Sequence, residues 1–151
     1  MTPTFYNTPA RQVELTEAAQ RWLGTPFHPH ACLRGVGVDC AHLVLSILQE
    51  TGAIKDWALP DYTMDGGDHR DTSLVTEWLE GNPRFQSLPE GEPALPGDLV
   101  CFRLGRVPHH VGLVIAPNRF IHAMRNYGVI QSQLDDPTFA KRLTATFRPV
   151  P

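Results

Sequence analysis

Three side chains in this sequence have the types that nucleophilic catalysis requires, namely Cys40, His110 and His122. A thiolate is a strong nucleophile, and an imidazole can take the thiol proton and later return it to a leaving group. A second imidazole can hold the first ring in the correct tautomer. If the fold brings these three residues together, they predict a site for acyl transfer.

Each of the three residues also has an ordinary structural interpretation. A cysteine at the start of a helix is more often a buried packing residue than a nucleophile, and a histidine in a strand is usually a hydrogen-bonded bystander. Spacing alone leaves both interpretations open for Cys40, His110 and His122. Their coincidence with one helix followed by a hairpin favours the catalytic interpretation.

The helix that would carry the cysteine is predicted by its caps and its apolar face. Asp39 is a good N-cap, Cys40 begins the first turn, and Gly52 sits where a C-terminal cap is expected. The buried face comprises Leu43, Val44, Ile47 and Leu48. The unpaired N–H groups of a helix N-terminus favour negative charge, so we expect Cys40 to be a thiolate and these groups to hold an oxyanion.

The two histidines lie on neighbouring strands of a predicted hairpin. Gly112 shares a strand face with His110, and because it has no side chain it would leave the backbone uncovered for a substrate chain. A turn at 117–118 makes His122 a near-diagonal neighbour of His110. One ring can then act as the base while the other orients it.

The chain has helical patterns first and strand patterns second, which is typical of an α+β domain with helices on one face of an antiparallel sheet. Besides the helix after Asp39, periodicity predicts helices over 9–23 and 71–80, and strands over 99–104, 110–116, 119–124, 129–134 and 143–148. Segments 25–38 and 55–71 are expected to be irregular, the second with a turn at 65–67. A length of 151 residues predicts one domain over 1–151.

Composition argues against several classes of protein. With 42% hydrophobic and 19% charged residues, the chain has a globular and not a disordered composition. A net charge of −3 argues against nucleic acid or an anionic membrane as a partner. We find no apolar run long enough for a membrane span, and residues 1–12 do not resemble a signal peptide, so we expect synthesis in the cytoplasm. Cys32, Cys40 and Cys101 are expected to be free thiols in a reducing compartment.

Six segments of the sequence, in this order, resemble the motifs of the NlpC-type cell-wall cysteine peptidases. They are Gly24–Phe27, Gly35–Cys40, Leu43–Val44, Pro96–Val100, His110–Leu113 and Phe120–Ala123. The resemblance covers nearly the whole chain, and the set is specific although each segment alone is weak. It implies a papain-like α+β fold, with N-terminal helices packed on a five- to six-stranded antiparallel sheet.

The same resemblance implies roles for the site residues and a substrate. Cys40 is expected to be the nucleophile, His110 the general base and His122 the orienting partner, without metal ion or cofactor. Members of the family cleave stem peptides of peptidoglycan, often between γ-D-glutamate and a diamino acid. The segment 60–62 and the long loop after Gly24 further resemble a branch encoded among tail genes of phages and gene-transfer particles. This implies tail-tip proteins as partners and action at the cell wall during DNA delivery.

Two positions depart from the family pattern. His42 stands where the family usually has glycine, and its imidazole would alter the cleft. Phe27 stands where many members have a tyrosine whose hydroxyl assists the oxyanion, a part that His28 or His30 could take. The candidate substrate-binding or oxyanion residues are therefore Asp39, Phe27, His28, His30, His42 and Gly112. The departures leave open a second hypothesis, a catalytically weak or inactive structural component of a tail tip.

A zinc site made of Cys40, His42, His110 and His122 is a third hypothesis, because sulfur and imidazole ligands suit that metal. Cys40 and His42 lie two residues apart on a helix, so their side chains point about 200° apart and can hardly share one ion. We therefore expect no metal ion.

Overall fold

A six-stranded antiparallel sheet is the centre of the computed structural model, which describes residues 1–60, 74–105 and 107–151. The strands are β3 (Phe85–Ser87), β4 (Leu99–Leu104), β5 (Val107–Ala116), β6 (Arg119–Met124), β7 (Gly128–Gln133) and β8 (Leu143–Pro149). Their order in space is β3-β8-β4-β5-β6-β7. The hairpin of β5 and β6, which carries both histidines, therefore lies inside the sheet and not at an edge.

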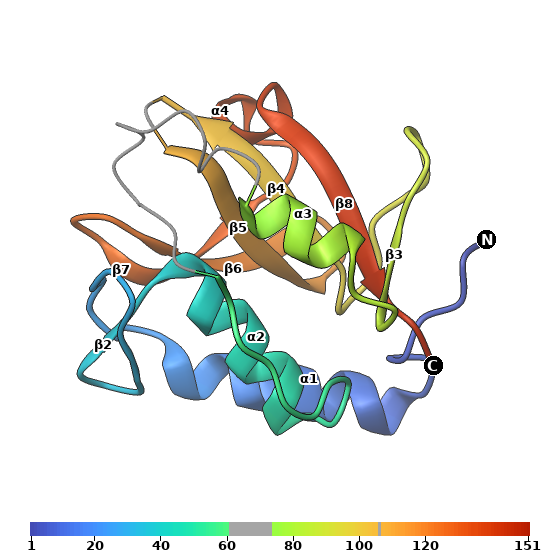
Figure 1. Cartoon of the computed structure of the whole chain (residues 1–151), viewed down its shortest axis with the longest axis horizontal. Helices are drawn as coiled ribbons and strands as arrows, with labels where there is room; N and C mark the ends of the chain where they lie inside the picture. The colour runs from blue at the N-terminus through green and yellow to red at the C-terminus, as the bar shows by residue number, and fades with distance from the viewer. Residues whose placement is uncertain (61–73, 106) are drawn as a thin grey trace.

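Two helices cover one face of this sheet, α1 (Pro9–Trp22) and α2 (Cys40–Glu50) (Figure 1). Thr8 caps the first and Asp39 the second, each by accepting a hydrogen bond from a backbone N–H of the first turn. Apolar side chains of both helices pack against the odd-numbered residues of β5 and form the main core. In the described part of the chain, no helix has the length and apolarity needed to span a bilayer.

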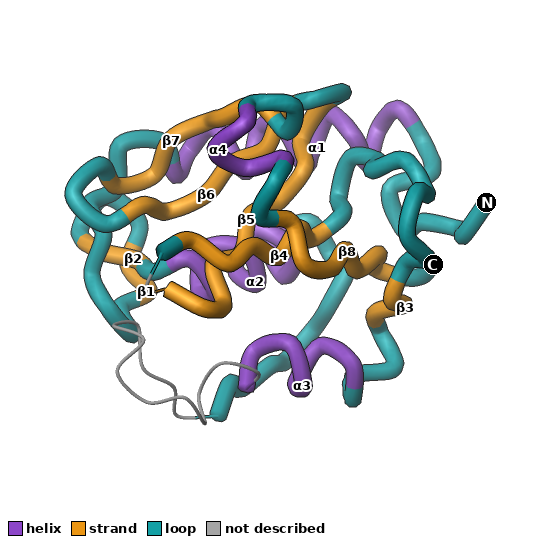
Figure 2. Tube along the Cα trace, turned by 90° about the horizontal axis from the view of Figure 1, so that it is seen from above, coloured by secondary structure: helices purple, strands orange, loops and turns teal. Residues whose placement is uncertain are grey.

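The other face of the sheet carries a smaller core. It consists of Val100, Phe102, Val114, Phe120 and Phe139. Phe139 comes from the short helix α4 (Pro137–Ala140), which lies across the sheet from α1 and α2 (Figure 1). Helix α3 (Leu74–Glu80) is set apart from these, near β3 (Figure 2). Its buried side chains, Val75 and Leu79, belong to the main core. Both faces of the central strands are thus covered by apolar side chains.

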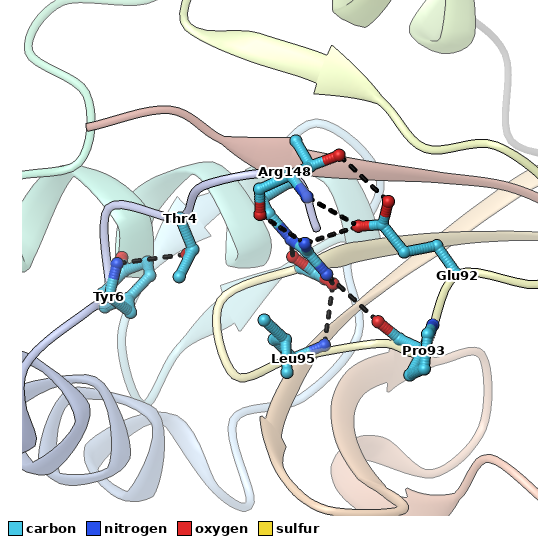
Figure 3. Close-up of polar contacts among 8 residues, drawn as sticks. Thr4, Tyr6, Glu92, Pro93, Leu95 and Arg148 are labelled. Atoms are coloured by element: carbon cyan, nitrogen blue, oxygen red, sulfur yellow. Dashed lines mark hydrogen bonds and ion pairs between the residues drawn. The ribbon is translucent and has the colours of Figure 1, made fainter.

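The two ends of the chain meet beside β8. The backbone N–H of Phe5 donates to the carbonyl of Pro149. The fully buried Arg148 donates two hydrogen bonds to Asp98, of 2.9 and 2.8 Å, and one of 2.6 Å to Glu92 (Figure 3). It also donates to the carbonyl of Thr2, so one side chain ties the N-terminal segment to β8.

The predicted architecture is confirmed, but the sequence analysis did not predict four short elements. The expected α+β fold, the helices after Thr8 and Asp39, and the strands that became β4 to β8 are all present, with ends shifted by up to three residues. The segment 25–38 is not wholly irregular, because it contains a hairpin of β1 (Cys32–Leu33) and β2 (Gly37–Val38). Strand β3 and helix α4 were also not predicted, because three or four residues are too few for a period to show. The turn at 65–67, residues 71–73 of the third helix and most of the segment 60–62 lie outside the described residues.

Candidate active site

Cys40 is the first residue of α2 and is fully buried. The backbone groups of Cys40, Ala41 and Val111 lie close enough to the thiol to lower its pKa. The first two belong to the N-terminal turn of α2, and the third belongs to β5. The sulfur is therefore seated between a helix N-terminus and the strand residue that follows His110.

This setting does not make Cys40 a thiolate at rest, which corrects the expectation from sequence. Burial, and to a smaller extent the neighbouring carboxylate of Asp39, raise the pKa of Cys40 to about 12. The three backbone groups lower the pKa by less than burial raises it. A helix N-terminus favours an anion only in competition with the loss of solvent, and here the loss of solvent is larger. The thiol consequently needs a base.

The local geometry of β5 explains how a strand can reach the sulfur. Among the described residues, the ladder between β5 and β6 runs from Ala116↔Arg119 to Leu113↔Ile121 and stops before the histidines. Val114 bonds through both its backbone groups to residues on the β4 side. Because backbone groups alternate along a strand, the N–H of Val111 points to the β6 side, where the ladder has ended. The Val111 N–H is therefore not used by the β5–β6 ladder, and the Val111 backbone lies close enough to the Cys40 thiol to lower its pKa.

The two histidines form a buried hydrogen-bonded pair, which agrees with their prediction as near-diagonal neighbours in a hairpin. His110 Nε2 lies 2.8 Å from His122 Nδ1, and the two side chains are almost without solvent exposure. His122 Nε2 lies 2.8 Å from the hydroxyl of Ser132 on β7. Rings of the smaller core, Phe102 and Phe120, pack against the pair. Ser132, His122 and His110 thus form a hydrogen-bonded chain that runs from the edge strand β7 to β5.

His122 is uncharged at neutral pH. Burial lowers its pKa to about 4, because an imidazolium ion loses solvation among apolar rings. A neutral imidazole has one N–H donor and one acceptor nitrogen, so His122 can connect His110 to Ser132 without adding charge. This suits an orienting partner better than a second base.

Gly112 does not leave the backbone open to a substrate, which corrects a second expectation. A Cβ atom at this position would lie 2.6 Å from a ring carbon of Phe120 and 3.2 Å from the carbonyl oxygen of Ile121. The missing side chain makes room for the Phe120 ring, which in turn packs against His122 with ring centroids 4.5 Å apart. Gly112 is therefore needed for packing, because the Phe120 ring on β6 occupies the space that a side chain at this position would take.

Asp39 has partners beyond its role as a cap. Its Oδ1 accepts from the backbone N–H of His42 and lies 2.8 Å from that residue's ring nitrogen Nδ1. Its Oδ2 accepts from the backbone N–H of His30, which has a φ of 61°. Asp39 is itself fully buried and links the loop before α2 to the start of that helix, and its part in binding a substrate stays a prediction.

With this geometry in place, comparisons with known proteins identify the family. A model of the NlpC/P60 family matches residues 21–148, which is most of the chain. This chain belongs to the NlpC/P60 family. The family consists of peptidoglycan endopeptidase-type hydrolases that are cysteine peptidases, and its model spans the cysteine and both histidines.

The relatives and solved structures agree with this assignment. The chain is 31% identical over 129 residues to a "Probable endopeptidase NlpC" of Escherichia coli (strain K12), covering 84% of this chain and 71% of that protein. It is 48% identical over 46 residues to a "Murein DD-endopeptidase MepS/Murein LD-carboxypeptidase" of the same strain, covering 30% of this chain but only 24% of the relative. A lipoprotein-like NLP/P60 family structure from Staphylococcus aureus superposes with a TM-score of 0.66 at 18% identity, over 100% of this chain and 45% of that one. The last comparison shows the fold alone, which is the expected NlpC/P60 α+β fold.

The remaining candidate residues of this NlpC/P60 domain lie on the segments around the start of α2. Phe27 is half-buried, bridges Val38 next to Asp39, and has the guanidinium of Arg125 5.4 Å from its ring centroid. It lines a groove of about 510 Å³ together with Gly24, Pro26, His28, Pro29, Arg125, Asn126, Tyr127 and Gly128. His28 and His30 are exposed. Whether either supports an oxyanion stays a prediction.

His42 and Cys101 are held by contacts within the fold. The ring of His42 binds Asp39 and packs edge-on against Trp57, with centroids 5.4 Å apart. Cys101 is a free thiol buried in the main core, and burial, with a smaller contribution from the nearby Cys40, raises its pKa. Within the residues described, no group of three or more histidine, cysteine or acidic side chains is placed to hold a metal ion, so the zinc hypothesis gains no support.

Ser132 was missed by the sequence reasoning. Its signal was available in part, since it lies in the strand predicted at 129–134. The pairing Phe120↔Ser132 puts its side chain on the face that carries His122. A register for the second hairpin would have been needed to select Ser132 from its polar neighbours.

Proposed function

We propose that this chain hydrolyses peptide bonds in the stem peptides of peptidoglycan, with Cys40 as nucleophile, His110 as general base and His122 as orienting partner. The observation that carries the assignment of roles is the 2.8 Å contact between His110 Nε2 and His122 Nδ1. It occupies Nε2 of His110, the residue that precedes Val111, whose backbone lies close enough to the Cys40 thiol to lower its pKa. The other ring nitrogen, Nδ1, is then the atom that takes the thiol proton.

The reaction begins from a protonated thiol. As the Cys40 sulfur attacks the scissile carbonyl carbon, its proton moves to His110 Nδ1, and a tetrahedral intermediate forms with its negative charge on oxygen. Backbone N–H groups at the start of α2 are suited to hold that oxyanion. His110 then gives the proton to the leaving amine, the C–N bond breaks, and a thioester remains. Water, deprotonated by His110, hydrolyses the thioester and restores the thiol.

For the bond, we propose the link between γ-D-glutamate and the diamino acid. The resemblance of the motifs supports this choice, and the groove beside Phe27 offers an aromatic ring and the cation of Arg125 to an acidic peptide. The relative named for DD-endopeptidase and LD-carboxypeptidase activities makes those two bonds the alternatives to test.

The test is turnover of defined muropeptides and purified sacculi, with products identified by mass spectrometry. The wild-type chain should release products that Cys40→Ala does not, by a factor of at least about 10³. Cys32→Ala is the matched control, because Cys32 is an exposed thiol outside the site, and it should retain activity. Equal inactivity of wild type and Cys40→Ala on every wall preparation would reject the proposal.

We further propose that the chain is made in the cytoplasm and carried by a phage-like particle, where it opens the wall locally. The support is the motif resemblance at 60–62 and after Gly24. The rival hypothesis is a structural tail component without activity, and the complete burial of the Cys40 side chain is the observation that favours it. Particles carrying Cys40→Ala discriminate the two. If they assemble but deliver DNA poorly the enzymatic role is supported, and if they deliver normally it is rejected.

A further inference from the structure

Ser132 lies at the outer end of the hydrogen-bonded chain that reaches His110. It belongs to the edge strand β7, it is half-buried, and its hydroxyl oxygen is 2.8 Å from His122 Nε2. We propose that Ser132 is a positioning residue that sets the tautomers of both histidines and so keeps His110 able to accept the thiol proton. This inference rests on the proposed function of Cys40 and His110.

The argument follows from counting protons along the chain. Each neutral imidazole carries one N–H, and the contact between His110 Nε2 and His122 Nδ1 needs one donor and one acceptor. If His110 donates, its Nδ1 is unprotonated and can act as a base, and the proton of His122 must sit on Nε2. If His122 donates, His110 carries its proton on Nδ1 and cannot receive another from the thiol without becoming doubly protonated. Only the first arrangement is productive.

Ser132 favours the productive arrangement because it offers an acceptor to the His122 Nε2–H. Around His122 the rings of Phe120 and Phe139 lie with centroids 4.5 and 5.2 Å away, and phenylalanine has no acceptor atom with lone pairs. Without the Ser132 hydroxyl, the Nε2–H of His122 would face those rings as a buried donor with no acceptor from residue 132, which costs free energy. The proton would then be better placed on Nδ1, toward His110. Removing the hydroxyl therefore reverses the direction of the whole chain.

The position of Ser132 also allows its hydroxyl hydrogen to point away from His122. A serine oxygen can accept one hydrogen bond while it donates another. Because Ser132 is only half-buried on an edge strand, its hydrogen can be directed to water while the oxygen accepts from His122. When His110 takes the thiol proton it still donates through Nε2, so the direction of every hydrogen bond in the chain is unchanged during the reaction. No second proton has to move.

The experiment compares Ser132→Ala and Ser132→Thr with wild type. Ser132→Ala should lower kcat by about 10–100-fold with KM nearly unchanged, as when a partner that fixes a histidine tautomer is removed at a metal site. Ser132→Thr keeps the hydroxyl and should restore most of kcat. Ser87→Ala, an exposed serine on β3, is the matched control and should match wild type. Equal kcat in Ser132→Ala and wild type would overturn the inference.

A spectroscopic readout makes the test independent of substrate. Imidazole ¹⁵N chemical shifts distinguish protonated from unprotonated ring nitrogens. In wild type the protons should sit on Nε2 of both His110 and His122, and in Ser132→Ala the His122 proton should move to Nδ1. A wild-type His122 protonated at Nδ1, or tautomers unaffected by Ser132→Ala, would overturn the inference. Because these spectra need no turnover, failure of the peptidase proposal would remain distinguishable from failure of this one.

Discussion

Two buried polar networks in this protein are built from opposite kinds of group. The histidine chain of His110, His122 and Ser132 contains a neutral His122 and ends at the proposed general base. The arginine cluster of Arg148, Asp98 and Glu92 is an ion-paired network that joins the chain ends. Fixed, paired charges hold backbone segments together, whereas neutral hydrogen-bonded rings can pass a proton with little rearrangement. We therefore expect damage to the first network to affect catalysis, and damage to the second to affect stability.

The largest expected effect is on catalysis, at His110. His110→Gln keeps a hydrogen-bonding group toward His122 but cannot accept a proton at neutral pH. Hydrolysis of muropeptides should fall about 10⁴-fold, as when a member of a catalytic triad is lost. Circular dichroism should show Tm within a few degrees of wild type. A variant that retained more than a tenth of the activity would show that another base serves Cys40.

The complementary experiment is Arg148→Met, which should lower stability and leave kcat nearly unchanged. It leaves the fully buried Asp98 without its cation, and removing one partner of a buried pair costs about 3–5 kcal/mol. For a domain of this size, the melting temperature should fall by roughly 6–20 °C. The kcat of the folded variant at low temperature should be close to that of wild type. Glu92→Gln is the milder comparison, since Glu92 is partly exposed. An unchanged Tm in Arg148→Met would end the contrast between the two networks.

The third expected effect concerns the resting state of the thiol. A rise in the pKa of Cys40 from 9.0 to about 12 lowers its thiolate fraction at neutral pH about a thousandfold. Iodoacetamide should therefore label the exposed Cys32 well before Cys40, and the Cys40 rate should rise about tenfold per pH unit from pH 7 to 9. Mass spectrometry of peptic fragments measures both sites in one sample. A plateau in the Cys40 rate below pH 8.5 would indicate a resting ion pair with His110 instead.

A smaller effect is the dependence of stability on pH through His122. Its pKa is about 4 in the folded chain against 6.5 ordinarily, so the unfolded chain binds the extra proton first as the pH falls. Stability from this group is complete above pH 6.5, declines between 6.5 and 4, and amounts to about 3 kcal/mol. His122→Gln should reduce the loss of unfolding free energy between pH 7 and 4.5, measured with urea. An equal loss in variant and wild type would place the acid sensitivity elsewhere.

The sequence predicts those parts of the site that local signals determine. Asp39 as a cap locates Cys40 at a helix start, and the turn at 117–118 brings β5 and β6 together so that His110 and His122 meet just beyond the end of their ladder. The pKa of Cys40 could not be predicted in the same way, because burial depends on β5 arriving from 70 residues away in the chain. The same limit applies to Ser132, whose selection needs the register of β6 with β7. Spacing thus located the reactive groups, and tertiary packing determined their protonation.

Gly112 shows most clearly how a correct face assignment can still give a wrong role. The alternation of β5 does place Gly112 on the face of His110, but Phe120 from β6 occupies the space there. The sequence of one strand shows that a glycine has no side chain, but only the fold shows whether a neighbouring strand fills the space beside it. The glycine is best understood as half of a pair with Phe120.

Gly112→Ala is the smallest of the expected stability effects and connects packing to catalysis. Its Cβ would lie 2.6 Å from the Phe120 ring, so that ring must shift, at a cost of about 1–3 kcal/mol. Because Phe120 packs directly against His122, the histidine chain should be displaced too, and kcat should fall by more than the loss of folded protein explains. Gly81→Ala, where an added Cβ meets its nearest neighbour at 3.4 Å, is the matched control. The double variant Gly112→Ala/Phe120→Leu makes room for the new methyl group, so it should recover kcat relative to Gly112→Ala. If the double variant were instead less active than either single one, the Phe120 ring itself would be what holds His122 in place, and the role of Gly112 would be secondary to it.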